Sequence, residues 1–290
     1  VVTSDIYHDI VREQLPEVSK NNIIVEPVYR STAPSVAWAT RCIAKRNCHA
    51  NVIITPSDQS ILNHKLFTNC ILEGLNFVST HNCLLAIGVQ PTRAETASDV
   101  YKRQVGNIYK VKAFTEKPDA AFAQMFVDSN EWLWNTGMYV GNVQCLKSNL
   151  HQCLSVAQID FDASPQEIDS ADDETYAKTI FPAFPNMSID YGILEKSADV
   201  HVLKCNFGWV DLGTWHGMYE SKSRTKGDNV VANGDVLFDD SSNNIVRLPN
   251  NKFAVLNGLD GYIVAEEGNV LLVCKKENSS ALIRKYVNEA

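Results

Sequence analysis

Two aspartates, far apart in the sequence, each lie in a short motif that can present a carboxylate to a ligand. Asp58 ends the segment Thr55-Pro-Ser-Asp58, and Asp211 lies between aromatic residues in the segment 207–215. Among the aromatic residues around Asp211, a carboxylate shielded from water is costly unless it is paired or binds a metal. Because Mg²⁺ prefers one or two carboxylates together with phosphate oxygens and water, the pair is a candidate Mg²⁺ site. Taken alone, either aspartate can instead cap a helix or stabilise a turn.

Two further motifs carry groups that suit a phosphorylated sugar. Glu116 can accept hydrogen bonds from hydroxyl groups, and Lys117 beside it can hold a phosphate as a point charge. Asn135 offers amide donors and an acceptor to hydroxyl groups, and Gly137 allows close approach of a ligand. The plainer alternatives are a surface ion pair for Glu116 and Lys117, and an ordinary turn around Asn135 and Gly137.

Two more segments hold candidate binding groups. In Glu26-Pro-Val-Tyr-Arg30, Arg30 can meet a phosphate and Glu26 can accept hydrogen bonds from the edge of a base. The segment 188–196 places Asp190 and Glu195 near a predicted short helix, for which Ser188 is a plausible N-cap. An ion pair within that helix is the structural alternative there.

Short apolar runs alternate with helical spacing over roughly the first two-thirds of the chain. The pattern predicts helices over 6–14, 32–44, 61–77, 120–128, 143–154 and 188–195, and strands over 22–25, 51–55, 83–89, 107–114, 138–140 and 200–205. This alternation favours a mostly parallel α/β sheet with helices on both sides. Such sheets bind ligands beyond the carboxyl ends of their strands, which is where Asp58 is expected.

The pattern changes near residue 226. Helical spacing disappears and short β runs recur at 230–231, 236–238, 245–248, 253–256, 262–265 and 270–274, separated by Asn, Gly and Asp. We therefore predict an α/β domain over 1–225 and a small all-β domain over 226–290, either a short β-helix or a stacked meander. A helix over 280–289 is expected to close it.

Composition excludes several classes of protein. The 290 residues are 45% hydrophobic and 21% charged, as in ordinary globular domains, and no apolar run reaches the roughly 18 residues of a membrane span. The formal net charge of −8 and the absence of a polybasic cluster argue against nucleic acid as a partner. The eight cysteines form no C-x-x-C pair, which predicts thiols in a reducing compartment. No Walker A, G-x-G-x-x-G, G-x-S-x-G or H-E-x-x-H motif is present.

The motifs gain specificity from their order along the chain. Together they resemble the mannose-1-phosphate guanylyltransferases, which are sugar-phosphate nucleotidyltransferases. The resemblance covers nearly the whole chain through the segments 26–34, 56–58, 86–96, 114–118, 134–138, 188–191 and 209–215. It implies a Rossmann-like, GT-A-like α/β domain with a mixed sheet, followed by a small left-handed β-helix.

The resemblance also implies an activity and roles for single residues. The family transfers GMP from GTP to α-D-mannose 1-phosphate and releases pyrophosphate, in the cytoplasm and with Mg²⁺. Asp58 and Asp211 match its metal ligands and, with Lys117, its catalytic groups. Substrate contacts are implied for the positions Glu26, Arg30, Glu116, Asn135, Gly137 and Asp190. The implied partners are GTP and mannose 1-phosphate, and the resemblance is compatible with a homodimer.

This sequence departs from the family pattern at two places. The family opens with a strand and a Gly-rich segment that wraps the nucleotide phosphates, and nothing like it precedes Val1, so we expect a member without that segment. Lys102 and Arg103 stand in the segment 97–104, where the family has a Gly- and Tyr-rich strand beside the sugar. Two alternatives therefore stay open. One is a catalytically impaired homologue that binds nucleotide sugars or regulates a partner, and the other is a transferase for another nucleotide and hexose 1-phosphate.

Overall fold

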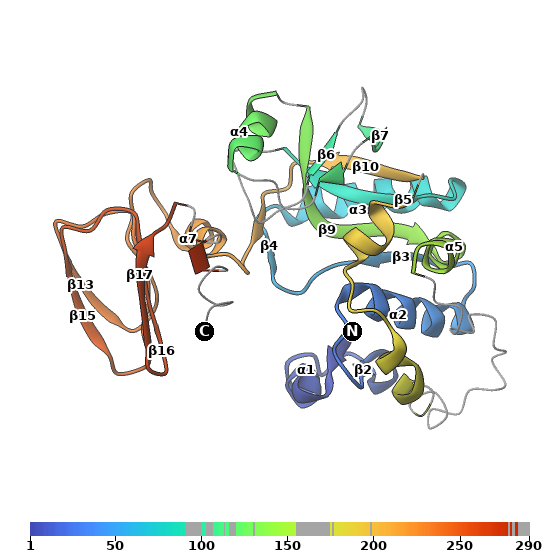
Figure 1. The fold of residues 1–290 in the computed structure, drawn as a ribbon, viewed down its shortest axis with the longest axis horizontal. Helices are drawn as coiled ribbons and strands as arrows, with labels where there is room; N and C mark the ends of the chain where they lie inside the picture. The colour runs from blue at the N-terminus through green and yellow to red at the C-terminus, as the bar shows by residue number, and fades with distance from the viewer. Residues whose placement is uncertain are drawn as a thin grey trace.

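The computed structural model describes residues 1–90, 100–102, 107–112, 114–115, 120–129, 131–154, 175, 177–197, 199–277, 279 and 282–283. These residues form a larger α/β part and a smaller β part joined through helix α7 (Trp215–Lys222), as Figure 1 shows. The prediction of an α/β fold with a mixed sheet is confirmed. The predicted closing helix over 280–289 falls almost wholly outside the described residues.

Seven strands from the described residues form the main sheet, with the order β7-β10-β5-β9-β6-β8 and β3 also paired to β9. Their bounds are β3 Asn51–Ile54, β5 Leu84–Val89, β6 Val100–Lys102, β7 Ile108–Lys110, β8 Phe114–Thr115, β9 Trp132–Asn142 and β10 Val200–Cys205. The pair β10 and β5 is parallel, whereas β9 runs antiparallel to β3, β5 and β6. The expectation of a mostly parallel sheet is therefore wrong. One reason is the long strand β9, of which the sequence pattern marked only 138–140; the short strands β7 and β8 also run antiparallel to their neighbours β10 and β6.

Helices cover both faces of this sheet, and the side chains of β5 alternate between them. Leu84 and Ala86 pack toward α2 (Thr32–Arg46), α5 (Val143–Leu154) and the 177–194 segment, while Leu85 and Ile87 pack toward α3 (His64–Thr80). All four residues are fully buried. A strand covered on both faces needs a continuous apolar run, which is why 83–89 is apolar throughout in the sequence.

The remaining elements of the α/β part are short. They are β1 Val2–Ser4, η1 Asp5–Tyr7, α1 His8–Gln14, η2 Lys20–Asn22, β2 Ile24–Glu26, β4 Gln59–Ile61, α4 Ala120–Ser129, η4 Phe181–Ala183, η5 Asp190–Leu194 and β11 Trp209–Asp211. β1 pairs with β2 in parallel, and β4 pairs with β11 in antiparallel. The helix expected over 61–77 begins later, because Ile61 belongs to β4 and the Asn63 side chain caps α3 by accepting from Leu66 N at 3.0 Å.

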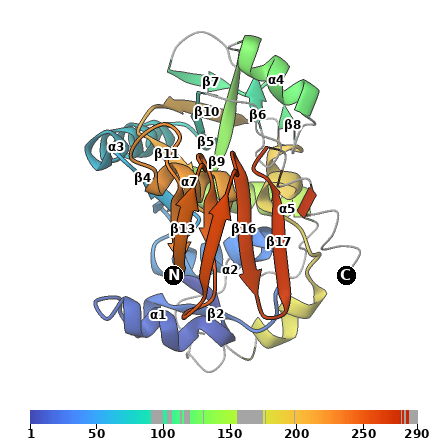
Figure 2. The same cartoon turned by 90° about the vertical axis from the view of Figure 1, so that its left-hand side faces the viewer.

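The β part is a stack of parallel strands closed by one antiparallel strand. β12 (Val230–Asn233), β14 (Ile245–Arg247) and β16 (Tyr262–Glu267) pair in parallel, β17 (Val270–Lys275) returns antiparallel to β16, and β13 (Asp235–Asp239) pairs in parallel with β15 (Phe253–Asn257). Figure 2 looks at this part with β13, β16 and β17 in front of α7. One face of the four-stranded sheet packs on Tyr219 of α7, and the other packs on the β13–β15 pair.

Within the described ranges, no helix has both the length and the apolar character that crossing a bilayer would require.

Candidate active site

The carboxylates of Asp58 and Asp211 converge above the backbone of Gly213. A β-carbon placed on Gly213 would lie 3.1 Å from Asp211 Oδ1 and 3.2 Å from Asp58 Oδ2. The two aspartates come from different strand ends, and the antiparallel pairing of β4 with β11 brings them together, with Asp211 opposite Gln59. Leu212 N also donates to Asp58 O at 3.0 Å, which fixes the backbone of one segment against the other.

Neither aspartate caps a helix, so that alternative is excluded for both, whereas the turn alternative holds for Asp211, whose side chain accepts a hydrogen bond from the backbone two residues on. The cap of α3 is Asn63, and the cap of α7 is Thr214, whose Oγ1 accepts from Gly217 N at 3.0 Å. Among the described residues, nothing donates a hydrogen bond to the exposed Asp58 carboxylate. The Oδ1 of half-buried Asp211 accepts from Gly213 N at 2.8 Å.

These two carboxylates fit a hard divalent cation such as Mg²⁺. Oxygen ligands on one side, with the remaining positions left to phosphate oxygens and water, are the arrangement that Mg²⁺ prefers. No group of three or more His, Cys, Asp or Glu side chains that could hold a metal occurs within the described ranges, so a site made only of protein ligands is not seen there. Asp58 and Asp211 are the residues of this region that would hold the ion.

A bulge in β9 forms the neighbouring part of the site. Tyr139 and Asn135 pair with Ala86 and Gly88 of β5, so that the intervening residues 136–138 stand opposite Ile87 alone. The hydroxyl of Thr136 donates to Ile87 O at 2.8 Å and so satisfies a carbonyl that the bulge removes from the ladder. Bulges of this kind re-aim side chains and are frequent beside active sites.

The bulge brings two side chains together that a regular strand would keep apart. Residues four positions apart on a strand are separated by about 13 Å, too far for an amide to reach a phenol. Here Asn135 Nδ2 lies 2.7 Å from Tyr139 Oη. Gly137 N donates to Asn135 Oδ1 at 3.0 Å and Gly137 has φ of +71°, a conformation in which side-chain-bearing residues are strained.

Asp190 completes a three-residue network with Asn135 and Tyr139. Asn135 Nδ2 donates to Asp190 Oδ1 at 2.8 Å, and the hydroxyl of Tyr139 donates to the same oxygen. Asp190 begins η5, a π-helix, where the prediction was an ordinary short helix. Turns of this kind are rare in proteins, and those that occur are often found at functional sites. Asn135 and Asp190, two of the predicted substrate-binding residues, are therefore brought together.

The bulge also contacts the segment that carries Asp58. A β-carbon on Gly137 would lie 3.2 Å from Pro56 Cγ, and Gln59 Nε2 donates to Thr136 O. The Oε1 of Gln59 is buried and has no hydrogen-bond partner among the described residues. The carboxylate pair and the Asn135 network are therefore adjacent parts of one site.

Glu26 is a buried acid with an unsatisfied oxygen. It is 8% exposed, and its Oε1 has no hydrogen-bond partner within the described residues. Burial raises the pKa of Glu26, and a hydrogen bond with the Ser35 side chain opposes this only in part. A buried polar atom without a partner is costly, so a hydrogen bond from water, from a ligand or from a residue outside the described ranges would stabilise this oxygen.

Arg30 lies beside the segment that leads into Asp190. Met187 N donates to Arg30 O at 3.2 Å, and Ile189 N donates to Thr32 Oγ1 at 2.9 Å. The Arg30 guanidinium donates to Pro182 O at 3.2 Å. The segment that carries Glu26 and Arg30 is thus joined through 187–189 to Asp190.

Some predicted residues lie where the structure gives no description. Glu116, Lys117 and Arg103 fall outside the described residues, and nothing is described of the side chain of Lys102 on β6. Their predicted roles stay predictions.

Sequence reasoning missed Tyr139, Gln59 and the supporting glycines Gly213 and Gly217. Tyr139 comes directly after the segment 134–138 that contains Asn135. Its hydroxyl, at a position expected in the core, was the feature that could have indicated a role in the site. The glycines of 207–217 were available too, but only the folded geometry shows that Gly213 faces both carboxylates.

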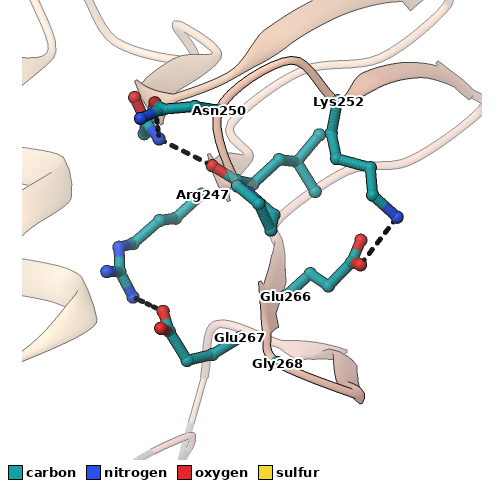
Figure 3. A pocket seen from close by; sticks show the side chains of 9 residues that line it. Arg247, Asn250, Lys252, Glu266, Glu267 and Gly268 are labelled. Carbon is teal, nitrogen blue, oxygen red and sulfur yellow. Dashed lines mark hydrogen bonds and ion pairs between the residues drawn. The ribbon is translucent and has the colours of Figure 1, made fainter.

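The β part carries a hollow that is distinct from this site. It is a groove of about 480 Å³ whose lining includes Arg247, Lys252, Glu266 and Glu267. Figure 3 shows Arg247 paired with Glu267 and Lys252 paired with Glu266, each at 2.9 Å. Both cations are already neutralised by carboxylates, so the groove offers no free charge to a phosphate.

Comparison with known proteins identifies the family to which the chain is similar. A family model described as Nucleotidyl transferase matches residues 1–228. A mannose-1-phosphate guanylyltransferase of Escherichia coli is 28% identical over 96% of this chain, and one of Salmonella muenchen is 29% identical over 96%. The chain spans 62% and 60% of the lengths of these two relatives. The matches confirm the resemblance that the motifs predicted.

A solved structure from Thermus thermophilus, described as a mannose-1-phosphate geranyltransferase, has a similar fold. The TM-score is 0.81 over 99% of this chain and 82% of that chain, at 22% sequence identity. At that identity the likeness shows the fold alone.

Proposed function

The chain belongs to the nucleotidyl transferase family, and from that premise we propose that it transfers GMP from GTP to α-D-mannose 1-phosphate, giving GDP-mannose and pyrophosphate. The observation that carries the proposal is the convergence of Asp58 and Asp211 over Gly213, beside the network of Asn135 and Asp190. The two aspartates suit a metal ion that is bound to the phosphates of a nucleotide. The polar side chains of Asn135 and Asp190 beside them suit the hydroxyl groups of a sugar phosphate.

The proposed reaction is a displacement at phosphorus. An oxygen of the sugar phosphate forms a bond to the α-phosphorus of GTP, and the bond from that phosphorus to the β-phosphate oxygen breaks, so pyrophosphate leaves with the electron pair. Positioning and charge neutralisation supply most of the catalysis in such transfers. Asp58 and Asp211 would hold Mg²⁺, which when bound would neutralise phosphate charge. Lys117 is proposed to add a second positive charge at the phosphates.

The side chains of this chain would orient the two substrates. Asn135, Gly137, Asp190 and Glu116 are proposed to act on the sugar side, and Arg30 at a phosphate. The Oε1 of Glu26, which has no hydrogen-bond partner in the part of the chain that the structure describes, supports recognition of a base edge that donates hydrogen bonds. Guanine presents two adjacent N–H donors at that edge, whereas uracil presents one.

Three finer proposals accompany the reaction. We propose that the parallel strands β12, β14 and β16 form a left-handed β-helix, for which their parallel pairing is the support. The chain is proposed to act in the cytoplasm, where nucleoside triphosphates are available. A homodimer is proposed from the resemblance alone.

The test is a matrix of substrates. The purified chain is incubated with each of GTP, UTP, ATP and dTTP and with mannose, glucose or galactose 1-phosphate, and pyrophosphate release is measured with and without Mg²⁺. We expect turnover to be highest with GTP and mannose 1-phosphate, and to require Mg²⁺. Asp211→Asn should lower kcat by about 10²-fold or more while the fold is kept, because an amide oxygen can still accept from Gly213 N. Asp235→Asn, an exposed change on β13, is the matched control.

The alternatives give different results in the same matrix. Highest turnover with another pair of substrates would replace GTP and mannose while leaving the transferase reaction in place. Saturable binding of GDP-mannose without turnover would favour the non-catalytic homologue. If the chain neither binds GDP-mannose nor turns over any pair of substrates, the proposal is overturned.

A further inference from the structure

Helix α7 contacts the segment of Asp211 at one end and the β part along its side, and it lies between the two parts of the molecule (Figure 1). At its start, Thr214 caps the helix, and Thr214 Oγ1 donates to Asp211 O at 3.1 Å. Five residues later, about 7.5 Å along the helix axis, the side chain of Tyr219 is 8% exposed. The eight residues of α7 therefore connect the backbone of Asp211 to the β part.

Tyr219 is held in the β part by three kinds of contact. Its hydroxyl donates to Asp228 O at 2.9 Å. The half-buried Lys276 places Nζ 3.2 Å from the centroid of the Tyr219 ring and also donates to Asn243 O at 3.0 Å. A cation over an aromatic ring is attracted by the negative face of the ring, and the attraction grows as water is excluded. The side chain also belongs to one buried cluster with residues of four strands, namely Val230, Ile245, Ile263 and Cys274.

Strand β11 by itself gives Asp211 little support. It has three residues, and in the described part of the chain β11 and β4 form a sheet of two strands. A sheet of two strands is marginally stable alone. Asp211 is the last residue of β11, and the chain passes from it directly into the turn that begins α7. The position of Asp211 therefore depends on the helix that follows it.

We infer that Tyr219 is a positioning residue for the Asp211 carboxylate, and that Lys276 of the β part holds Tyr219 in that role. The inference rests on the proposed function, in which Asp211 is a metal ligand, and adds to it. Because α7 is joined internally by backbone hydrogen bonds, a tilt of the helix at Tyr219 also displaces Thr214 and the carbonyl that it contacts. The β part thereby sets how closely the Asp211 carboxylate approaches that of Asp58.

A second lysine lies over a tyrosine ring on the other face of the same sheet and provides a matched control. Lys275 Nζ lies 4.4 Å from the centroid of the Tyr262 ring and donates to Asp260 O at 2.8 Å. Tyr262 and Lys275 stand opposite each other in the β16–β17 ladder, whereas their neighbours Ile263 and Cys274 face the cluster on α7. Since side chains alternate along a strand, the Lys275–Tyr262 pair points away from α7.

The first experiment compares Lys276→Met with Lys275→Met, because methionine keeps much of the apolar stem and removes the charge. In Lys276→Met we expect the Mg²⁺ concentration for half-maximal turnover to rise by about 3- to 10-fold. KM for mannose 1-phosphate at saturating Mg²⁺ should stay unchanged. Mn²⁺ binding without substrates, followed by electron paramagnetic resonance, should weaken by the same factor. Lys275→Met should leave all three values unchanged, and equal effects of the two variants on metal binding would overturn the inference.

Tyr219→Phe tests the same connection with less risk to folding. It keeps the ring and the packing, and it removes only the hydrogen bond from the hydroxyl to Asp228 O. We expect weaker Mn²⁺ binding, in the same direction as in Lys276→Met. A lower melting temperature with unchanged Mn²⁺ affinity in both variants would show that Tyr219 serves stability alone, and would overturn the inference.

Hydrogen exchange separates the inference from the proposed function, because it needs neither substrate nor metal. The amides of Gly217 and Met218 donate to Thr214 Oγ1 at 3.0 Å and to Thr214 O at 2.9 Å. We expect both to exchange several-fold faster in Lys276→Met than in the parent protein or in Lys275→Met. Unchanged exchange would overturn the inference even in an active enzyme. Faster exchange and weaker Mn²⁺ binding, in a protein whose parent turns over no pair of substrates, would support the connection through α7 and overturn the proposed reaction.

Discussion

A β-carbon on Gly217 would lie 1.8 Å from the carbonyl oxygen of Asp211. No side chain can occupy that space, so the first turn of α7 and the end of β11 approach each other only because residue 217 is a glycine. Thr214 Oγ1 bridges the two, donating to Asp211 O at 3.1 Å and accepting from Gly217 N at 3.0 Å. The position of the Asp211 carboxylate therefore depends on a residue that takes no part in chemistry.

Gly217→Ala should destabilise the protein and displace Asp211. The new methyl group meets backbone, which cannot rotate away, and overpacking of this kind costs about 3 kcal/mol or more. We expect a lower unfolding free energy in urea together with a loss of Mg²⁺-dependent turnover. Gly141→Ala is the control, because its β-carbon would lie 3.4 Å from Leu84 Cδ1, an ordinary contact. Equal stability of the two variants would contradict the geometry at Gly217.

Gly213→Ala should weaken metal binding and leave the fold intact. Gly213 is exposed, and its added β-carbon would lie 3.1 and 3.2 Å from one oxygen each of Asp211 and Asp58. The methyl group would fill the space between the carboxylates and push them apart. We expect the Mg²⁺ concentration for half-maximal turnover to rise by about 10-fold, which corresponds to ~1.4 kcal/mol.

Mn²⁺ binding followed by electron paramagnetic resonance reports on the same site without turnover. It should weaken in parallel in Gly213→Ala, while the unfolding free energy stays close to that of the parent protein. Unchanged Mn²⁺ affinity would place the metal somewhere other than between Asp58 and Asp211.

Glu26→Gln should change how stability depends on pH. Burial raises the pKa of Glu26 above its ordinary value of 4.5, so the folded state binds this proton more tightly than the unfolded state does. The resulting stabilisation is complete below pH 4.5 and is lost as pH rises through the folded-state pKa. The glutamine variant should therefore gain stability relative to the parent as pH rises from 4.5 and then level off. Melting temperatures measured from pH 4.5 to pH 8 test this, and a constant difference would contradict it.

Native alkylation should distinguish the cysteines by exposure and pKa. Cys48 is exposed, whereas burial raises the pKa of Cys83 to about 12 and that of Cys145 to about 11. The thiolate is the reactive form, so at pH 8 Cys83 and Cys145 are almost wholly unreactive thiols. We expect iodoacetamide to label Cys48 first, and the two buried residues only after urea unfolding, as mass spectrometry of peptides will show. Early labelling of Cys145 would mean that α5 does not pack as described.

Much of the secondary structure could be predicted from the sequence, because it follows local periodicity. The 83–89 run became β5 with alternate side chains in two cores, and the helices at 32–44 and 143–154 became α2 and α5. The tail strands also formed where short β runs were seen, at β12 to β17. Periodicity alone does not give strand direction, which is why the mostly parallel sheet was wrong. The direction of β9 is set by long-range pairing with β3, β5 and β6.

The sequence by itself determined the residue types of the site and, through the order of its motifs, the family to which the chain belongs. Only the tertiary structure decided how these residues meet. Asp58 and Asp211 converge because β4 pairs with β11, and Asn135 reaches Tyr139 and Asp190 because β9 bulges and η5 takes a π-turn. Residue type and local spacing are properties of neighbouring residues. Convergence depends on hydrogen bonds and packing between segments far apart in the chain, which no local pattern encodes.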